Sequence, residues 1–162
     1  MFVRTAGERD LAAIRTLLVE TWHATYDAIY GAARVTEITG EWHSIASLKA
    51  RLVRPNSEFL VADDGKRLGG MAFAAATKDT KIVLLNQLYV HPDCQRQGIG
   101  QALMEEVEAS FPEAQLLRLE VEEANAVAIA FYRSQGFLPA GKTADCGGDS
   151  GLPALIFEKV IG

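Results

Sequence analysis

A glycine-rich turn between an apolar strand and a helix constrains this chain more than any other segment. The apolar run that ends at Val90 stops before Pro92, and Gly98 and Gly100 then open an amphipathic helix. Glycine has no Cβ atom, so the backbone can approach a ligand closely. The first N–H groups of the helix converge there, with the positive end of the helix dipole behind them. The turn predicts a phosphate or pyrophosphate site, to which Arg96 can add a charged contact. The alternative is a turn that only needs small residues.

Two other phosphate-binding motifs are excluded by their context. The Rossmann fingerprint needs a third glycine where this chain has Leu103, and no strand–helix–strand unit begins the chain. A literal match to the Walker A pattern runs from Gly136 to Thr143. It follows a predicted helix instead of a strand, and too little chain remains after it to build a nucleotide domain.

The hydrophobic pattern predicts an α/β fold with a mixed sheet. Strands are expected at residues 2–4, 58–62, 67–77, 81–90, 115–121, 137–142 and 152–160, and helices at 10–25, 35–40, 44–52, 98–111 and 125–135. Ser44 is expected to cap the third helix and Gly136 to end the last one. Hairpin strands followed by two strand–helix units imply a mixed sheet with helices on both faces. No repeat or linker divides the chain, so residues 1–162 are expected to form one domain.

Composition excludes several classes of protein. The net charge of −5 argues against a nucleic-acid partner or an anionic membrane surface, both of which need a basic patch. No apolar run reaches the ~18 residues of a membrane span, and the N-terminus resembles no signal peptide. Cys94 and Cys146 fit neither a disulfide framework nor a zinc site, so two free thiols in the cytoplasm are expected and no metal is predicted.

A second motif makes the interpretation specific. The apolar strand at 117–121 precedes the pattern N-x-x-A-x-x-F-Y-x-x-x-G-F, which runs from Asn125 to Phe137. Together with Gln95-x-x-Gly98-x-Gly100, this pattern resembles the GNAT superfamily of acetyl-CoA-dependent N-acetyltransferases. The resemblance covers residues 2–160, and its specific motifs lie within residues 84–137.

The resemblance implies the GNAT fold, a central twisted mixed sheet in which two parallel strands splay around acetyl-CoA. Those strands would be 81–90 and 115–121. In the family, the pantetheine arm pairs with the first strand as an extra strand would, and backbone amides of the turn carry the pyrophosphate. The matching residues are Leu88, Tyr89 and Val90 for the arm and Gln95, Arg96, Gln97, Gly98, Ile99, Gly100 and Gln101 for the pyrophosphate. By the same resemblance, Asn125 binds the pantetheine and Tyr132 lies near the sulfur.

Acetyl transfer from a thioester to an amine expels a thiolate, and a neutral tyrosine such as Tyr132 can serve as its general acid or hydrogen-bond donor. A backbone N–H at a strand bulge could stabilise the oxyanion. The general base is less clear, because the stretch 85–88, where many relatives carry a glutamate, has no carboxylate. Glu120 resembles the base position proposed for ribosomal-protein N-terminal acetyltransferases; the alternative is a solvated or salt-bridged side chain. His91 is interpreted as a turn residue.

The acetyl acceptor is suggested by aromatic residues near the N-terminus. Trp22, Tyr26 and Tyr30 repeat every four residues, which is typical either of core packing or of a wall that holds a cationic amine. The arrangement resembles bacterial polyamine and related small-molecule members of the family. The favoured hypothesis is direct transfer, in a ternary complex, to a primary amine of a small molecule. The alternatives are a protein N-terminus or lysine, and a catalytically silent CoA-binding sensor. Homodimers are common among relatives.

Overall fold

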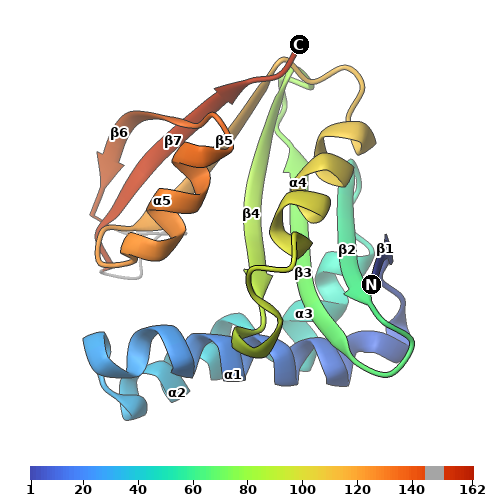
Figure 1. Ribbon diagram of the computed structural model, residues 1–162. Helices are drawn as coiled ribbons and strands as arrows, with labels where there is room; N and C mark the ends of the chain where they lie inside the picture. Colours follow the sequence, from blue (N-terminus) through green and yellow to red (C-terminus); the bar gives the residue numbers. More distant parts are fainter. Residues whose placement is uncertain (145–151) are drawn as a thin grey trace.

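The computed structural model describes residues 1–144 and 152–162, and its strands form one seven-stranded sheet (Figure 1). Along the sheet the order is β1-β2-β3-β4-β5-β7-β6. Every neighbouring pair is antiparallel except β4 and β5, which are parallel. The strands are β1 (Phe2–Thr5), β2 (Ser57–Asp63), β3 (Leu68–Ala76), β4 (Ile82–Val90), β5 (Leu116–Glu122), β6 (Leu138–Thr143) and β7 (Ala154–Val160).

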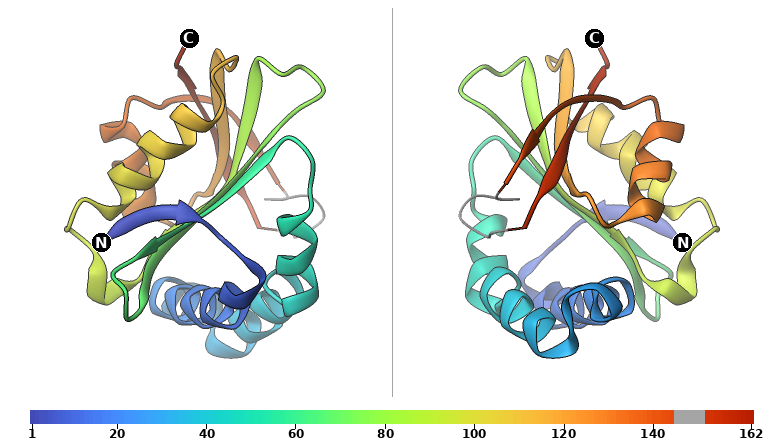
Figure 2. Two further views of the ribbon diagram at one scale, coloured as in Figure 1. Left: turned by 90° about the vertical axis from the view of Figure 1, so that its right-hand side faces the viewer. Right: turned by 90° about the vertical axis from the view of Figure 1, so that its left-hand side faces the viewer.

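Helices cover both faces of the sheet, as predicted. One face carries α4 and α5, and the other carries α1, α2 and α3 (Figure 2). The helices are α1 (Leu11–Tyr30), α2 (Ala32–Trp42), α3 (Ile45–Leu52), α4 (Ile99–Ser110) and α5 (Ala126–Ser134). Short 3-10 turns at Glu8–Asp10 and Pro92–Cys94 precede α1 and the glycine-rich turn. The α/β fold with a mixed sheet is therefore confirmed.

The sheet opens between its two parallel strands. Pairing between β4 and β5 is confined to three residues of each strand, from Ile82 opposite Leu116 to Leu84 opposite Arg118. Beyond that point the strands diverge towards α1, and the sheet separates into two arms (Figure 1). The predicted splayed strands are thus present, and among the described residues the rest of β4 pairs with no strand on that side.

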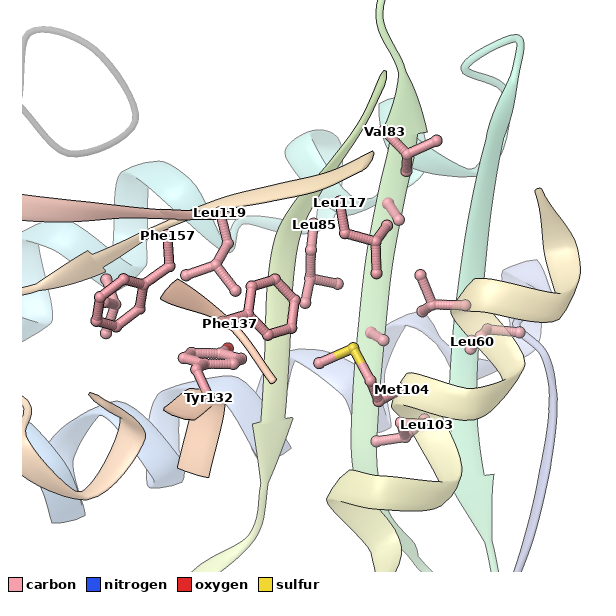
Figure 3. Packing of buried hydrophobic residues seen from close by; sticks show 14 of the residues in the cluster. Leu60, Val83, Leu85, Leu103, Met104, Leu117, Leu119, Tyr132, Phe137 and Phe157 are labelled. Atoms are coloured by element: carbon pink, nitrogen blue, oxygen red, sulfur yellow. The ribbon is translucent and has the colours of Figure 1, made fainter. Parts of the chain in front are cut away.

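A large apolar core holds the two arms together above the opening. It lies between the sheet and α4 and α5, and Figure 3 shows Tyr132, Phe137 and Phe157 on one side of it and Leu103 and Met104 on the other. Each fully buried large apolar side chain contributes about 1.5–3 kcal/mol to the free energy of folding. The core therefore fixes the angle between the arms, which shapes the opening.

A β-bulge in β4 redirects the side chains that face the opening. Phe73 of β3 pairs with Gln87 and the next residue, Ala74, pairs with Leu85, so Asn86 is the extra residue. Leu85 belongs to the core beside α4, whereas Gln87 points to the opposite face, where its Nε2 lies 3.2 Å from Nδ1 of His43. The bulge thus lies at the point where the two parallel strands part.

The boundaries of several elements differ from the predicted ones by a few residues. Helix α1 continues to Tyr30 instead of residue 25, because Trp22 and Tyr26 are packed into a third apolar cluster with α2. Ser44 caps α3 as predicted, with its Oγ accepting from Ser47 N at 3.1 Å. The C-cap of α5 is Gln135, and Gly136, which was predicted to end the helix, follows it two residues after Ser134 with a φ of +95°.

The two cysteines fall in different parts of the chain. Cys94 is a buried free thiol. Cys146 lies in residues 145–151, outside the described residues.

Candidate active site

A cavity of about 790 Å³ fills the opening between β4 and β5. Its walls come from α1, the outer half of β4, the glycine-rich turn, the end of β5 and α5. Predicted site residues that line it are Tyr26, Leu88, Tyr89, Val90, Gln95, Arg96, Gly98, Ile99, Gly100, Gln101, Glu120, Asn125 and Tyr132. Gln97, Trp22 and Tyr30 do not line it. A cavity of this size lies within the range that small ligands and cofactors occupy.

The glycine-rich turn has the backbone shape of an anion site. Arg96 and Gly98 both adopt left-handed conformations, with φ of +63° and +79°. A turn with such residues can form a concave anion site from backbone N–H groups, and the first N–H groups of α4 have no partner within their helix. A Cβ atom added to Gly98 would meet nothing within 4 Å, so the space in front of the turn is open. The turn therefore fits a pyrophosphate, as coenzyme A carries, with the Arg96 side chain at the cavity wall.

The outer half of β4 presents a backbone edge to the cavity. From Leu85 to Val90 the strand pairs with β3 on one side only. Within this stretch, the Val90 carbonyl accepts a hydrogen bond from Nε2 of Gln95 at 3.3 Å. An extended ligand arm with amide groups can pair with such an edge as an added strand.

Asn125 is held in one orientation at the start of α5. Its Oδ1 accepts from Ala128 N at 3.0 Å, which caps the helix, and its Nδ2 donates to the Tyr26 hydroxyl at 3.0 Å. The Tyr26 hydroxyl in turn donates to Oε2 of Glu122 at 2.7 Å. Helix α1 therefore meets the end of β5 and the start of α5 at the cavity wall through one hydroxyl group.

Tyr132 is buried beneath the cavity with its ring packed edge-on against Phe137. Burial raises the pKa of its hydroxyl above the ordinary value of 10, and the nearby carboxylate of Glu122 raises it further. The hydroxyl therefore stays protonated at neutral pH. It is suited to donating a hydrogen bond to a developing anion in the cavity.

Two carboxylates lie at the end of β5 on the face towards α1. Glu120 is exposed to the cavity, whereas Glu122 is 6% exposed and receives the Tyr26 hydroxyl. Sequence reasoning missed Glu122 because the strand was predicted to end at Val121. Extending the alternation of β5 by one residue would have placed Glu122 on the same face as Glu120.

The predicted aromatic wall is not formed by its three rings. Trp22 is fully buried, with ring centroids 4.5 Å from Tyr26 and 5.5 Å from Trp42. Tyr30 stacks on Tyr26 at 5.4 Å but does not line the cavity. The repeat therefore reflects packing of α1, and Tyr26 alone of the three reaches the cavity.

His91 lies at the turn that precedes the glycine-rich segment. Its Nδ1 accepts from Asp93 N at 3.1 Å, and its Nε2 lies 2.7 Å from Oε2 of Glu20. These contacts fit the predicted turn role.

In the described part of the chain, no group of three or more His, Cys, Asp or Glu residues could hold a metal ion. None of its helices is long and apolar enough to cross a membrane.

A sheet split between two parallel strands, with a glycine-rich turn that fits a pyrophosphate at the mouth of the split, is the arrangement expected of an acyl-CoA-dependent transferase. The sequence model of the acetyltransferase (GNAT) family matches residues 12–137, and the chain belongs to this family of acetyl-CoA-dependent N-acetyltransferases.

Two curated relatives and one solved structure illustrate the similarity. The chain is 32% identical to a peptidyl-lysine N-acetyltransferase, YiaC of Escherichia coli, over 83% of this chain and 82% of that protein. It is 28% identical to a spermidine N(1)-acetyltransferase of Thermoplasma acidophilum, over 83% of this chain and 86% of that protein. Its fold matches the PaiA N-acetyltransferase of the same organism, solved with coenzyme A, with a TM-score of 0.85 and 25% identity over 98% of both chains.

Proposed function

We propose that this protein transfers the acetyl group of acetyl-CoA directly to the primary amine of a small cationic molecule, with both substrates bound together. The observation that carries the proposal is the distribution of charge in the cavity. Of the described residues that line it, Arg96 is the one basic residue, and Glu120 and Glu122 are the acidic ones. Arg96 belongs to the phosphate-binding turn, whereas both carboxylates lie in the last part of β5 on the face towards α1.

This polarity matches the charges of the two proposed substrates. The pyrophosphate of acetyl-CoA is anionic and fits the turn at Arg96 and the start of α4. A primary amine is protonated at neutral pH, because its ordinary pKa is near 10.4. Two carboxylates at the other end attract such a cation, and they would repel an acceptor that carries carboxylates of its own.

The residues of the cavity support a division of roles in the reaction. Acetyl-CoA would supply the acetyl group as a thioester, already activated for attack. The outer half of β4 holds its extended arm, and a backbone N–H at the bulge of Asn86 is a candidate donor to the carbonyl oxygen. Tyr132 donates a hydrogen bond towards the departing sulfur, because its raised pKa keeps its proton in place.

The amine must lose a proton before it attacks. Removing that proton from a group with a pKa near 10.4 costs about 4.6 kcal/mol at pH 7. Glu120 lines the cavity and is open to water, so it can accept the proton directly or through one bridging water. Glu122 is less suited to this step, since one of its oxygens already accepts from Tyr26.

A second candidate acceptor is the side chain of a lysine in a protein. The similarity to a peptidyl-lysine acetyltransferase favours it, and a lysine carries the same charge into the cavity as a small amine does.

A panel of acceptors tests both candidates through the release of free thiol from acetyl-CoA. The panel contains spermidine, a lysine-bearing peptide, and glutamate as an anionic control. Turnover with spermidine above that with the peptide supports the small-molecule proposal, and turnover with the peptide alone overturns it.

A further inference from the structure

One hydroxyl group joins the two ends of the cavity. Tyr26 of α1 donates its proton to Glu122 at the acceptor end and accepts from Asn125 at the start of α5. Tyr26 is separated from these partners by 96 and 99 residues along the chain. The turn in which Asn125 N donates to the Glu122 carbonyl at 3.0 Å holds these two residues near each other, so it is the tertiary fold that brings Tyr26 to them.

The direction of each hydrogen bond is fixed by chemistry. The N–H of Ala128 can only donate, so the Asn125 atom that it contacts must be the carbonyl oxygen. The amide nitrogen of Asn125 then faces Tyr26 and donates to it. The single proton of the Tyr26 hydroxyl is left for Glu122, which as a carboxylate can only accept. Ala128 therefore fixes the position of the carbonyl oxygen of Asn125, and Tyr26 fixes that of the amide nitrogen. The amide nitrogen carries a second N–H, which does not donate to Tyr26.

Burial shields the hydrogen bond between Tyr26 and Glu122 from water. Tyr26 is 1% exposed and Glu122 is 6% exposed. The Tyr26 ring is itself held by Trp22 and Tyr30, with ring centroids 4.5 Å and 5.4 Å away. The hydroxyl is therefore held in place, and removing it takes one hydrogen bond from each of its two partners.

We propose that Tyr26 is a positioning residue that orients Asn125 for the cofactor arm and Glu122 for the acceptor amine. The inference rests on the proposed function, because it assigns acetyl-CoA to the Asn125 side of the cavity and a cation to the Glu122 side. Acting through Asn125, Tyr26 sets the affinity for coenzyme A, and acting through Glu122 it sets the Michaelis constant of the amine. One side chain of the first helix thereby influences both substrates.

The variant Tyr26→Phe removes the hydroxyl and keeps the ring in its packing. We expect it to weaken coenzyme A binding by about 3- to 10-fold, the change that corresponds to one lost hydrogen bond. The matched control is Tyr30→Phe, which makes the same chemical change one turn further along α1, outside the cavity lining. This control should leave the affinity unchanged. Thermal melting of both variants checks that they fold.

The route of the effect is tested with Asn125→Ser, which keeps a good helix cap but removes the amide donor. If Tyr26 acts through Asn125, adding Tyr26→Phe to Asn125→Ser should weaken coenzyme A binding no further. Glu122→Gln keeps an oxygen that can accept from Tyr26 but removes the charge. It should raise the Michaelis constant of the amine about 10-fold or more and leave the coenzyme A affinity unchanged.

Isothermal titration of the full chain with coenzyme A tests the proposed role of Tyr26, since this measurement needs no knowledge of the acceptor. Equal affinities for Tyr26→Phe and Tyr30→Phe, or losses that add in the Tyr26→Phe/Asn125→Ser double variant, would overturn the role of Tyr26 while leaving the proposed function intact. A wild-type protein that binds no coenzyme A would overturn the proposed function, and this inference with it.

Discussion

A Cβ atom on Gly100 would lie 3.1 Å from Cζ of Phe131, so the first turn of α4 and the middle of α5 meet at the wall of the cavity. Only the absence of a side chain at Gly100 permits this approach. The two helices cover different arms of the split sheet (Figure 1). Gly100 therefore sets how closely the arms approach each other beside the phosphate-binding turn.

Gly100→Val should weaken acetyl-CoA binding by at least about 10-fold, because the new side chain must displace Phe131 or enter the cavity. Isothermal titration measures the affinity. Phe131→Ala in the Gly100→Val background separates the two causes: recovery of binding shows that the helix contact was responsible, and no recovery shows that valine blocks the pyrophosphate directly. Unchanged affinity in Gly100→Val alone would contradict the assignment of the site.

Tyr132→Phe should lower kcat by about 10²–10⁴-fold and leave the affinity for acetyl-CoA nearly unchanged. The hydroxyl is proposed to act on the departing sulfur, so its contribution appears mainly in the transition state. Since burial and Glu122 raise its pKa, wild-type kcat should show no loss from ionisation of Tyr132 up to about pH 10. Single-turnover rates that are equal in the two proteins would reduce Tyr132 to a packing residue.

Glu120→Gln should reduce kcat/KM at neutral pH and recover part of the loss at high pH. Recovery is expected because a free amine then arrives already deprotonated, which leaves less for the base to do. The matched control is Glu123→Gln, a carboxylate three residues further along that pairs with Lys142 at 3.7 Å and does not line the cavity. A loss in Glu120→Gln that is the same at every pH would assign Glu120 to substrate positioning.

The stability of the fold should fall in mildly acidic solution because of His43. Burial lowers the pKa of His43 to about 3, and the charge of Arg51 contributes to the shift. The unfolded chain binds the proton near pH 6.5, so stability is complete above that pH and decreases as the pH falls towards 3. The expected loss is about 2–3 kcal/mol between pH 6.5 and pH 4.5.

Urea unfolding at those two pH values, for the wild type and for His43→Phe, measures this loss. The variant should lack most of the pH dependence, although it also leaves Nε2 of Gln87 without the His43 ring nitrogen. The ion pair of Asp10 with Arg4 does not interfere, since the pKa of Asp10 is lowered to about 2 and its effect lies below pH 4. An unchanged stability of the wild type between the two pH values would contradict the burial of a neutral His43.

The parts of the site that are local in sequence could be predicted. The glycine-rich turn and the helix cap are each formed by a few neighbouring residues at the start of a helix, so the local sequence was enough to predict Gly98, Gly100 and Asn125. The split of the sheet could be predicted only through the family resemblance. The sequence pattern by itself does not indicate that pairing of β4 and β5 stops after Leu84.

Contacts between distant elements could not be predicted in the same way. The stripe of Trp22 and Tyr26 indicates a buried helix face, but spacing alone does not distinguish a ring that packs from one that meets a ligand. The hydrogen bond between Tyr26 and Glu122 spans 96 residues, and it depends on α1 crossing the end of β5. The burial of Glu122 follows from that crossing, so it became visible only in the folded chain.

The central claim is that acetyl passes from acetyl-CoA to an amine held at the carboxylate end of the cavity. Carbon NMR with acetyl-CoA labelled at the acetyl carbonyl tests it most directly, in the presence of the purified protein and spermidine. The account predicts a new amide carbonyl signal that grows as the thioester signal disappears, more slowly in Glu120→Gln. Growth of free acetate without an amide signal, or a thioester signal that persists with spermidine and with the lysine peptide alike, would contradict it.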